Sequence, residues 1–235
     1  MRVGRRLINL FLRTALRVIS RVEIRGLENA PRSGRQIVMF DHVNFLDAPI
    51  IAAFWPREVE ALTKAENLRS GFLAPFMRIY GAFPVNRGEV DRRALGSATW
   101  ALEGDRVLLI SPEGTRSRGK GLGKAKDGMA LLAVRTGSPL VPVAVWGQEE
   151  VVPAMLRLRR ARVYMQVGRP FRFDYQPSGK IDREAIRQMT TEAMYILSAM
   201  LPERYRGLYS DLSQATYRYI CYEDGEAGAQ GPAPA

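Results

Sequence analysis

The chain contains one histidine, His42, and an aspartate, Asp47, follows it five positions later. Histidine is the side chain whose unperturbed pKa of about 6.5 lets it take and return a proton near neutral pH. Five residues of a continuous helix turn by about 500°, which would point the two side chains to different faces. They can meet only if His42 lies in a turn and Asp47 in the first turn of the next helix. Asp47 would then fix the ring tautomer, and the other ring nitrogen would be a general base for a substrate hydroxyl.

The spacing of this pair is weak evidence alone, because such pairs also occur by chance. A second segment, Ser111-Pro112-Glu113-Gly114-Thr115-Arg116-Ser117, directly follows an apolar run. It offers the backbone freedom of Gly114, the hydroxyl of Thr115 and a guanidinium fork, that of Arg116, suited to phosphate. Earlier in the chain, Arg87 comes just after a short predicted strand, where α/β sheets present ligands.

Short apolar runs alternate with helical patterns and predict the elements that position these residues. Strands are expected over residues 36–40, 59–63, 82–86, 106–110, 139–146 and 162–167, and helices over 47–55, 73–80, 91–103, 127–136 and 181–200. Asn44 can form the turn or the N-cap before the helix of residues 47–55, and Pro49 falls in its first turn, where proline is tolerated. The alternation indicates an α/β layered domain.

The charge balance favours an anionic partner. Lys and Arg number 35 against 24 Asp and Glu, a formal net charge of +11. Nucleic acid, an anionic membrane surface, and a phosphorylated or acyl-carrier substrate all fit this charge. No nucleic-acid module is visible around the arginine-rich residues 157–162, so we expect no nucleic-acid partner. The single cysteine, Cys221, excludes an intramolecular disulfide and indicates a reducing cytosol, and one histidine without a second ligand cluster leads us to expect no metal and no other cofactor.

The two ends of the chain combine apolar or aromatic residues with arginines. Residues 5–20 form a broad apolar helical stripe interrupted by arginines, too charged for a span of about 20 apolar residues and without the cleavage site of a signal peptide. This pattern suits an amphipathic helix at a bilayer interface, and a helix packed on the core is the alternative. Tyrosines and arginines interleave over residues 204–222, as at a membrane interface or in a packed cap, and residues 223–235 are predicted to be a disordered tail.

Four blocks occur in order: His42-x4-Asp47, Gly81-x-Phe83-x3-Arg87, Pro112-Glu113-Gly114-Thr115-Arg116-Ser117, and Val141-Pro142-Val143. This order resembles the glycerolipid acyltransferase family, whose best-known members are the 1-acylglycerol-3-phosphate acyltransferases. The resemblance covers about residues 20–200. It implies a mixed, largely parallel sheet flanked by helices, with an amphipathic interface helix at 1–21, the acyltransferase domain at 22–222 and the tail at 223–235. It also implies a peripheral enzyme on the cytoplasmic side of the membrane.

The resemblance also implies roles for individual residues. His42 would be the general base and Asp47 its orienting partner; Arg87, Gly114, Thr115 and Arg116 would bind the acceptor phosphate; Glu113 would position the acceptor or brace the arginines; and Pro142 would shape the acyl or donor side. Structural alternatives remain: surface ion pairs for the arginines, a cap or a bond to Arg116 for Glu113, and a turn for Thr115. Two residues depart from the family pattern, because Asp41 stands where an Asn is common and Asn44 where a Ser is common. Asp41 would add a negative charge beside His42.

We therefore expect an O-acyltransferase that uses acyl-CoA or acyl carrier protein as the donor co-substrate. The expected acceptor is a lysophospholipid, 1-acylglycerol 3-phosphate, which gives phosphatidic acid without an acyl-enzyme. Two alternatives stay open: acylation of another lysolipid or a lipid amine, and a non-catalytic peripheral membrane protein of the same fold.

Overall fold

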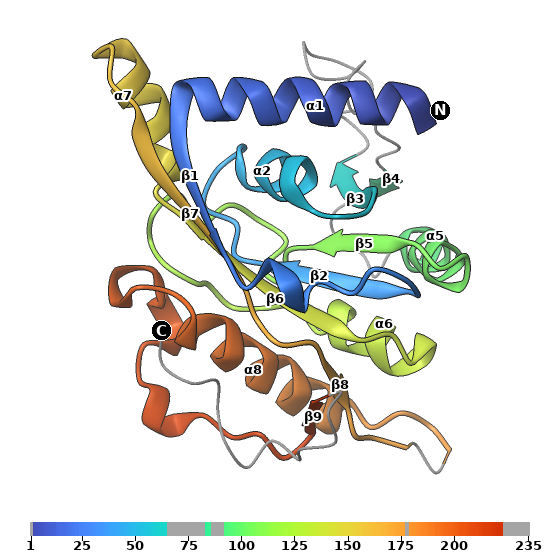
Figure 1. Ribbon diagram of the computed structural model, residues 1–235. Coiled ribbons are helices and arrows are strands. Elements are labelled where there is room, and N and C mark those ends of the chain that lie inside the picture. Colours follow the sequence, from blue (N-terminus) through green and yellow to red (C-terminus); the bar gives the residue numbers. More distant parts are fainter. Residues whose placement is uncertain (1, 65–82, 86–91, 177–178, 223–235) are drawn as a thin grey trace.

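The computed structural model describes residues 2–64, 83–85, 92–176 and 179–222 (Figure 1). The strands are β1 Ser20–Arg25, β2 Gln36–Phe40, β3 Val59–Lys64, β4 Phe83–Val85, β5 Val107–Ile110, β6 Leu140–Trp146, β7 Ala161–Val167, β8 Phe171–Phe173 and β9 Ile220–Tyr222. The α-helices are α1 Arg2–Ile19, α2 Asp47–Phe54, α5 Arg92–Glu103, α6 Gly128–Thr136, α7 Val151–Leu156 and α8 Arg183–Ala199. Short 3-10 turns are η1 Leu27–Asn29, η2 Gln148–Glu150, η3 Glu203–Tyr205, η4 Gly207–Tyr209 and η5 Leu212–Gln214.

The strands form one sheet in the order β1-β7-β6-β2-β5-β3-β4. Outside this order, β8 pairs with β6, and β9 pairs with β8. The central strand β2 is parallel to both of its neighbours, β5 and β6. Antiparallel pairing occurs between β6 and β7 and in the contacts of β8. This confirms the α/β domain that the alternation predicts and the mixed, largely parallel sheet that the family resemblance implies.

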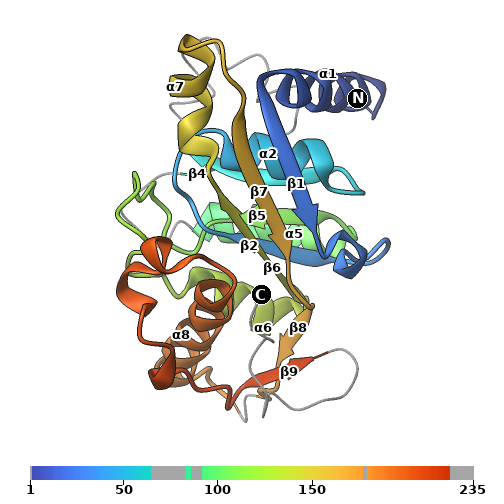
Figure 2. The ribbon, with the colours of Figure 1, turned by 60° about the vertical axis from the view of Figure 1, so that its left-hand side comes forward.

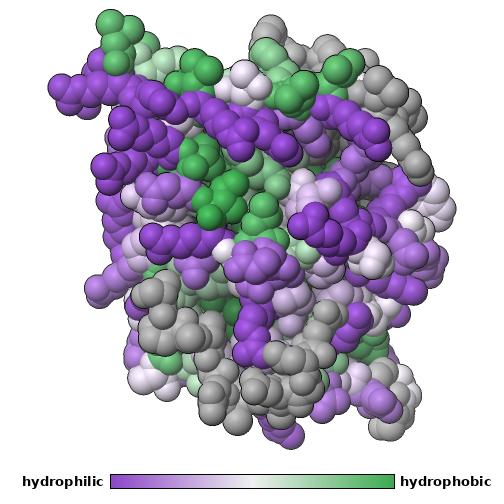
Figure 3. All heavy atoms as spheres, viewed as in Figure 1, coloured by the Kyte–Doolittle hydropathy of each residue, from purple (hydrophilic) through white to green (hydrophobic). Residues whose placement is uncertain are grey.

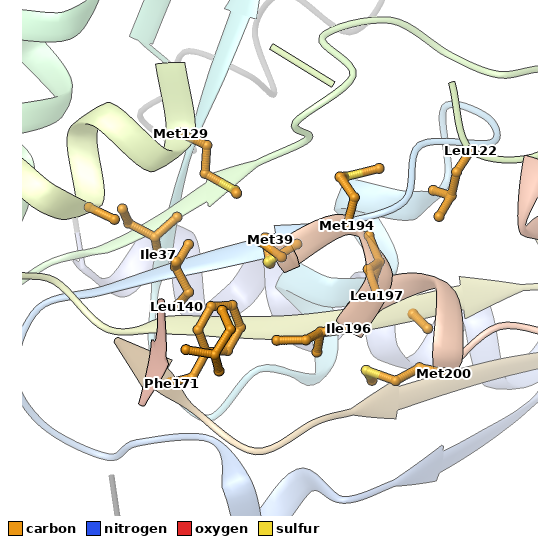
Figure 4. Packing of buried hydrophobic residues seen from close by; sticks show 14 of the residues in the cluster. Ile37, Met39, Leu122, Met129, Leu140, Phe171, Met194, Ile196, Leu197 and Met200 are labelled. Atoms are coloured by element: carbon orange, nitrogen blue, oxygen red, sulfur yellow. The ribbon is translucent and has the colours of Figure 1, made fainter. Parts of the chain in front are cut away.

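Helices cover both faces of this sheet, and the residues of β2 show why it lies at the centre. Val38 and Phe40 pack in one buried cluster with residues of α1 and α2. Ile37 and Met39 point to the other face, into a cluster with α6 and α8 (Figure 4). A strand that is buried on both faces must be apolar at every position rather than alternating, as the run Ile37-Val38-Met39-Phe40 is.

The predicted strands and helices that fall on described residues are present, with ends that move by one or two residues. The helix predicted over 73–80 lies outside the described residues. Among the strands and α-helices of the described residues, four were not predicted: β1, α7, β8 and β9. Edge strand β1 alternates the charged Arg21, Glu23 and Arg25 with apolar residues, a half-buried strand pattern that was overlooked. Strands β8 and β9 have three residues each, too few to show a periodic pattern.

Helix α1 lies against the domain and also presents apolar side chains to the solvent. Leu16 is buried in the core, and the Arg13 guanidinium donates to the Ala53 carbonyl at 2.7 and 3.0 Å. On the outside of α1 a group of large apolar side chains, called here the α1 stripe, is 61–70 % exposed: Leu7, Leu10, Phe11 and Val18. None of the helices in the described part of the chain is long and apolar enough to cross a membrane.

The C-terminal segment packs on the domain. Tyr205 and Tyr222 are buried in the core cluster with α8. The buried carboxylate of Glu192, on α8, accepts hydrogen bonds from the backbone amides of Arg218 and Tyr219 at 3.0 and 2.9 Å. This geometry matches the packed alternative for these aromatic residues, although the segment consists of 3-10 turns and a short strand. The predicted tail of residues 223–235 lies outside the described residues.

Candidate active site

The candidate site lies at one edge of the sheet, where three parallel strands end. His42 follows β2, residues 111–117 follow β5, and Gln148 follows β6. Because these strands are parallel neighbours, their carboxyl ends lie side by side, as in other α/β sheets that bind ligands at this edge. Segments separated by up to about a hundred residues along the chain therefore meet at one place.

His42 and Asp47 make the contact that the sequence predicts. The Nδ1 atom of His42 lies 2.7 Å from Oδ2 of Asp47, the first residue of α2. Asn44 forms the turn between them: its Oδ1 accepts from the Leu46 amide at 2.7 Å, and its own amide donates to Asp47 Oδ2 at 2.9 Å. The Asp47 side chain is fully buried, whereas that of His42 is 24 % exposed. Nε2 is thus the ring nitrogen left for a substrate.

Gln148 binds the other oxygen of Asp47, a contact that was not predicted from the residues. Its Nε2 donates to Asp47 Oδ1 at 2.6 Å and to the Val145 carbonyl at 3.3 Å, and its side chain is fully buried. Burial raises the pKa of Asp47 above its ordinary value, and the hydrogen bonds of His42, Gln148 and Asn44 oppose part of that rise. Gln148 therefore supports the charged form of Asp47. Its only signal in the sequence is its place just after a predicted buried strand.

We expect the variant Gln148→Leu to lose about tenfold in kcat, because Asp47 Oδ1 is left buried without a donor, at a cost of about 1–3 kcal/mol. The free energy of unfolding should fall by a similar amount. Gln36→Leu is a matched control, since Gln36 is also fully buried, donates to the Pro31 carbonyl, and lies at the opposite end of β2. Steady-state kinetics and urea unfolding of both variants test this. Equal kcat values for the two variants would contradict a positioning role for Gln148.

Glu113 links the loops that surround His42. It is 4 % exposed, and its two oxygens accept from the backbone amides of His42 at 3.3 Å and Gly123 at 2.7 Å. The Ser117 amide also donates to the His42 carbonyl, at 2.7 Å. Glu113 thus bonds to backbone amides rather than to Arg116, because the loop after β5 folds back over the turn that carries His42. Burial raises the pKa of Glu113.

The rest of the block after β5 forms an exposed basic loop. Gly114 takes the left-handed conformation, with φ +65°, and its amide donates to the Ser111 carbonyl at 3.1 Å, a turn that favours glycine. Thr115 and Arg116 are both exposed. Further exposed basic residues follow before α6, and with Arg116 they are called here the basic rim: Arg118, Lys120, Lys124 and Lys126. Arg87, the other predicted phosphate ligand, lies outside the described residues.

Asp41 is a buried carboxyl group next to His42 in the chain, and its environment favours the neutral acid over the negative charge expected there. It is 2 % exposed, its Oδ1 accepts from the Val145 amide at 2.7 Å, and its Oδ2 has no hydrogen-bond partner among the described residues. Burial and then the nearby charge of Asp47 raise its pKa well above the ordinary value. Two neighbouring carboxyl groups whose pKa values are pushed apart tend to divide into one neutral and one charged group. We therefore interpret Asp41 as the neutral acid and Asp47 as the charged one.

The variant Asp41→Asn tests this interpretation through the pH dependence of stability. A raised folded-state pKa contributes stability that is complete below the unfolded pKa and is lost as the pH rises through the folded one. Asparagine keeps the acceptor oxygen and never ionises. We expect the variant to have a higher Tm than the wild type, with a difference that grows as the pH rises. Each kcal/mol of difference in the free energy of unfolding corresponds to about 2–4 °C in Tm. In acid the two Tm values should become equal. Thermal melts across the pH range would contradict this if the two curves stayed parallel.

These observations define a class of protein. The family model described as Acyltransferase matches residues 21–146, more than half of the chain, and so the chain belongs to this family. The matched segment contains His42, Asp47, Glu113, Gly114 and Arg116, and it ends two residues before Gln148.

Individual relatives carry more specific names. The chain is 28 % identical over 128 residues to a 1-acyl-sn-glycerol-3-phosphate acyltransferase of Borreliella burgdorferi, and this alignment covers 54 % of this chain and 51 % of that protein. It is 27 % identical over 191 residues to a lyso-ornithine lipid O-acyltransferase of Pseudomonas aeruginosa, and this alignment covers 73 % of this chain and 70 % of that protein. The crystal structure of the 1-acyl-sn-glycerophosphate (LPA) acyltransferase PlsC of Thermotoga maritima is similar, with a TM-score of 0.59, 27 % identity, and 80 % of this chain and 75 % of that chain covered. The chain thus spans only about half the length of the Borreliella protein.

Proposed function

We propose that this protein transfers a fatty acyl group from an acyl thioester to the free hydroxyl of a lysophospholipid. The proposed acceptor is 1-acylglycerol 3-phosphate, and the product is phosphatidic acid. The observation that carries the proposal is the 2.7 Å contact between His42 Nδ1 and the buried Asp47, with Nε2 left for a substrate, in a chain of the Acyltransferase family. The names of the Borreliella and Thermotoga relatives support the acceptor.

The proposed mechanism needs no acyl-enzyme. Nε2 of His42 removes the proton of the acceptor hydroxyl as its oxygen attacks the thioester carbonyl carbon. A carbon–oxygen bond forms, the carbon–sulfur bond breaks, and the departing thiolate takes the proton from the imidazolium. Asp47 stabilises the imidazolium between these steps, and Gln148 and the Asn44 amide hold Asp47 in place.

The basic rim supplies the charge for the anionic substrates. Arg116 offers a planar fork that can bind a phosphate through two parallel hydrogen bonds. The loop is anchored beside His42 by the Ser117 and Arg118 amides, which donate to the His42 and Val43 carbonyls at 2.7 and 3.2 Å. Arg87 is the second phosphate ligand in this proposal. The donor is acyl-CoA or acyl-loaded carrier protein, both of which are anionic and suit the same basic edge.

We place the protein peripherally on the cytoplasmic face of an anionic membrane, with α1 at the interface. The exposed α1 stripe supplies the apolar contact, and the exposed Arg6 and Arg17 on the same helix match anionic head groups. This location brings the candidate site to a lipid acceptor that does not leave the bilayer.

The test is acyl transfer to lysophosphatidic acid from a long-chain acyl-CoA, and from the same acyl group on carrier protein, with vesicles present. We expect phosphatidic acid as the product. Arg116→Ala should raise the KM for the acceptor about tenfold with a smaller change in kcat, because a hydrogen bond to a charged group is worth about 1.5–3 kcal/mol. Arg32→Ala is the matched control, since Arg32 is also exposed but precedes β2, at the other end of that strand. Absence of product with both donors would contradict the proposed acceptor.

A second candidate acceptor comes from the Pseudomonas relative. Its alignment covers 73 % of this chain, more than the 54 % covered by the Borreliella relative. A lyso-ornithine lipid carries an amino-acid head group without a phosphate. Acylation of such a lipid, with a KM that Arg116→Ala leaves unchanged, would favour this acceptor over 1-acylglycerol 3-phosphate.

A further inference from the structure

The end of α7 carries exposed apolar side chains that the site does not use. Val152 and Met155 are 41 % and 46 % exposed, Leu156 is 78 % exposed and Leu158 is 98 % exposed. These four residues are called here the α7 tip. Large apolar side chains this exposed, and gathered in one short segment, mark a surface that binds another apolar surface.

The backbone at the tip holds Leu158 outward at a conformational cost. After α7 the Leu158 amide donates to the Met155 carbonyl at 3.0 Å, and the Arg159 amide donates to the Ala154 carbonyl at 2.8 Å. This pair of bonds ends a helix with one residue in the left-handed conformation, a position that glycine usually takes. Here that residue is Leu158, with φ +53°. A branched apolar residue in a strained, solvent-exposed position indicates a use for its side chain rather than for its backbone.

The tip is tied to the end of α1. The Arg160 guanidinium donates to the Arg17 carbonyl, and to the Ser20 carbonyl at 2.8 Å, the carbonyls where α1 ends and β1 begins. Figures 1 and 2 show α7 and α1 at the same end of the molecule, away from α8. In Figure 3 apolar side chains lie along this upper rim over both helices, directly above a band of hydrophilic side chains.

We propose that the α7 tip is a second membrane-insertion point that acts together with the α1 stripe on an anionic phospholipid bilayer. The inference deepens the proposed function, on which it rests for the membrane as the site of action. Charge complementarity favours a bilayer over a neutral partner, because Arg157 and Arg159 flank Leu158 and are exposed, and no acidic residue lies between Val151 and Arg160. Leucines can then enter the acyl boundary while the arginines stay at the head groups. Two insertion points fix the rotation of the domain on the membrane, which one helix cannot do.

The test is co-sedimentation of the full chain with vesicles of phosphatidylcholine, with and without phosphatidylglycerol. We expect Leu156→Ser and Leu158→Gly each to weaken binding to the phosphatidylglycerol vesicles by about tenfold. This fold-change corresponds to the low end of the free energy of burying a leucine side chain. Leu158→Gly also removes the backbone strain, so its Tm should stay equal to that of the wild type or rise. A structural role for Leu158 would instead lower the Tm. Leu208→Ser is the matched control, since Leu208 is 68 % exposed but lies in η4, near α8.

Two results would overturn the proposal. One is wild-type vesicle binding by the α7 variants while α1 remains intact. The other is a wild-type dimer in solution that Leu156→Ser converts to a monomer, as measured by light scattering, because the tip would then be covered by a second copy. Vesicle binding needs no turnover, so a chain that binds vesicles through α7 but acylates no lysolipid would contradict the proposed function and leave this inference standing.

Discussion

Replacing His42 by alanine is expected to lower kcat for acyl transfer by about 10²–10⁴-fold, the usual contribution of a general base. The chain contains no second histidine that can take over. The imidazole also packs edge-on against Phe40, with ring centroids 5.5 Å apart, so circular dichroism and a thermal melt must show that the variant is folded. The measurement is initial rate against lysophosphatidic acid, with wild type and His42→Ala at matched protein concentration.

The outcome separates chemistry from membrane binding. His42 lies at the carboxyl edge of the sheet and the apolar membrane contacts lie on α1 and α7, so His42→Ala should bind phosphatidylglycerol vesicles as the wild type does. A folded variant that keeps its activity would rule out His42 as the base. Equal loss of activity and vesicle binding would indicate a folding defect instead.

The variant Asp47→Asn is expected to lose up to about 10⁴-fold in kcat, even though its shape is nearly unchanged. Gln148 donates to Oδ1 and would keep an oxygen there, which turns the new amide nitrogen toward His42 Nδ1. That nitrogen is a donor, so the imidazole would hold its proton on Nε2, where the base must be unprotonated. The same nitrogen would face the Asn44 amide, leaving a buried donor without an acceptor, and we expect the free energy of unfolding to fall by about 1–3 kcal/mol.

A second substitution makes this prediction specific. In the double variant Asp47→Asn, Gln148→Glu, the new carboxylate accepts from the amide nitrogen and turns the amide oxygen back toward His42. We expect part of the lost kcat to return, because the tautomer is restored although the negative charge is farther from the imidazolium. Kinetics of the two single variants and the double variant form a cycle. Additive losses would show that Gln148 does not set the orientation of residue 47.

Strands and helices with strong periodicity could be predicted from the residues alone, as could the turn in which His42 and Asp47 can meet. Both depend on short-range features: the fully apolar run of β2, the turn-forming Asn44, and the start of a helix at Asp47. Such features act within a few residues, so one chain segment is enough to show them. The same holds for Gly114, whose left-handed turn is a local property of the loop after β5.

The distant groups that contact this pair could not be predicted, because they depend on how the strands pair. Gln148 contacts Asp47 from 101 residues away, and Glu113 contacts the His42 amide from 71 residues away, because β5 and β6 pair with β2 in parallel. The raised pKa of Asp41 could not be predicted from the sequence either, since its main cause is burial rather than residue type. The exposure of the α7 tip could not be predicted for the same reason, because burial depends on the tertiary packing. Hydrophobicity predicts that a leucine prefers burial, but whether a partner surface covers it depends on how the strands and helices pack.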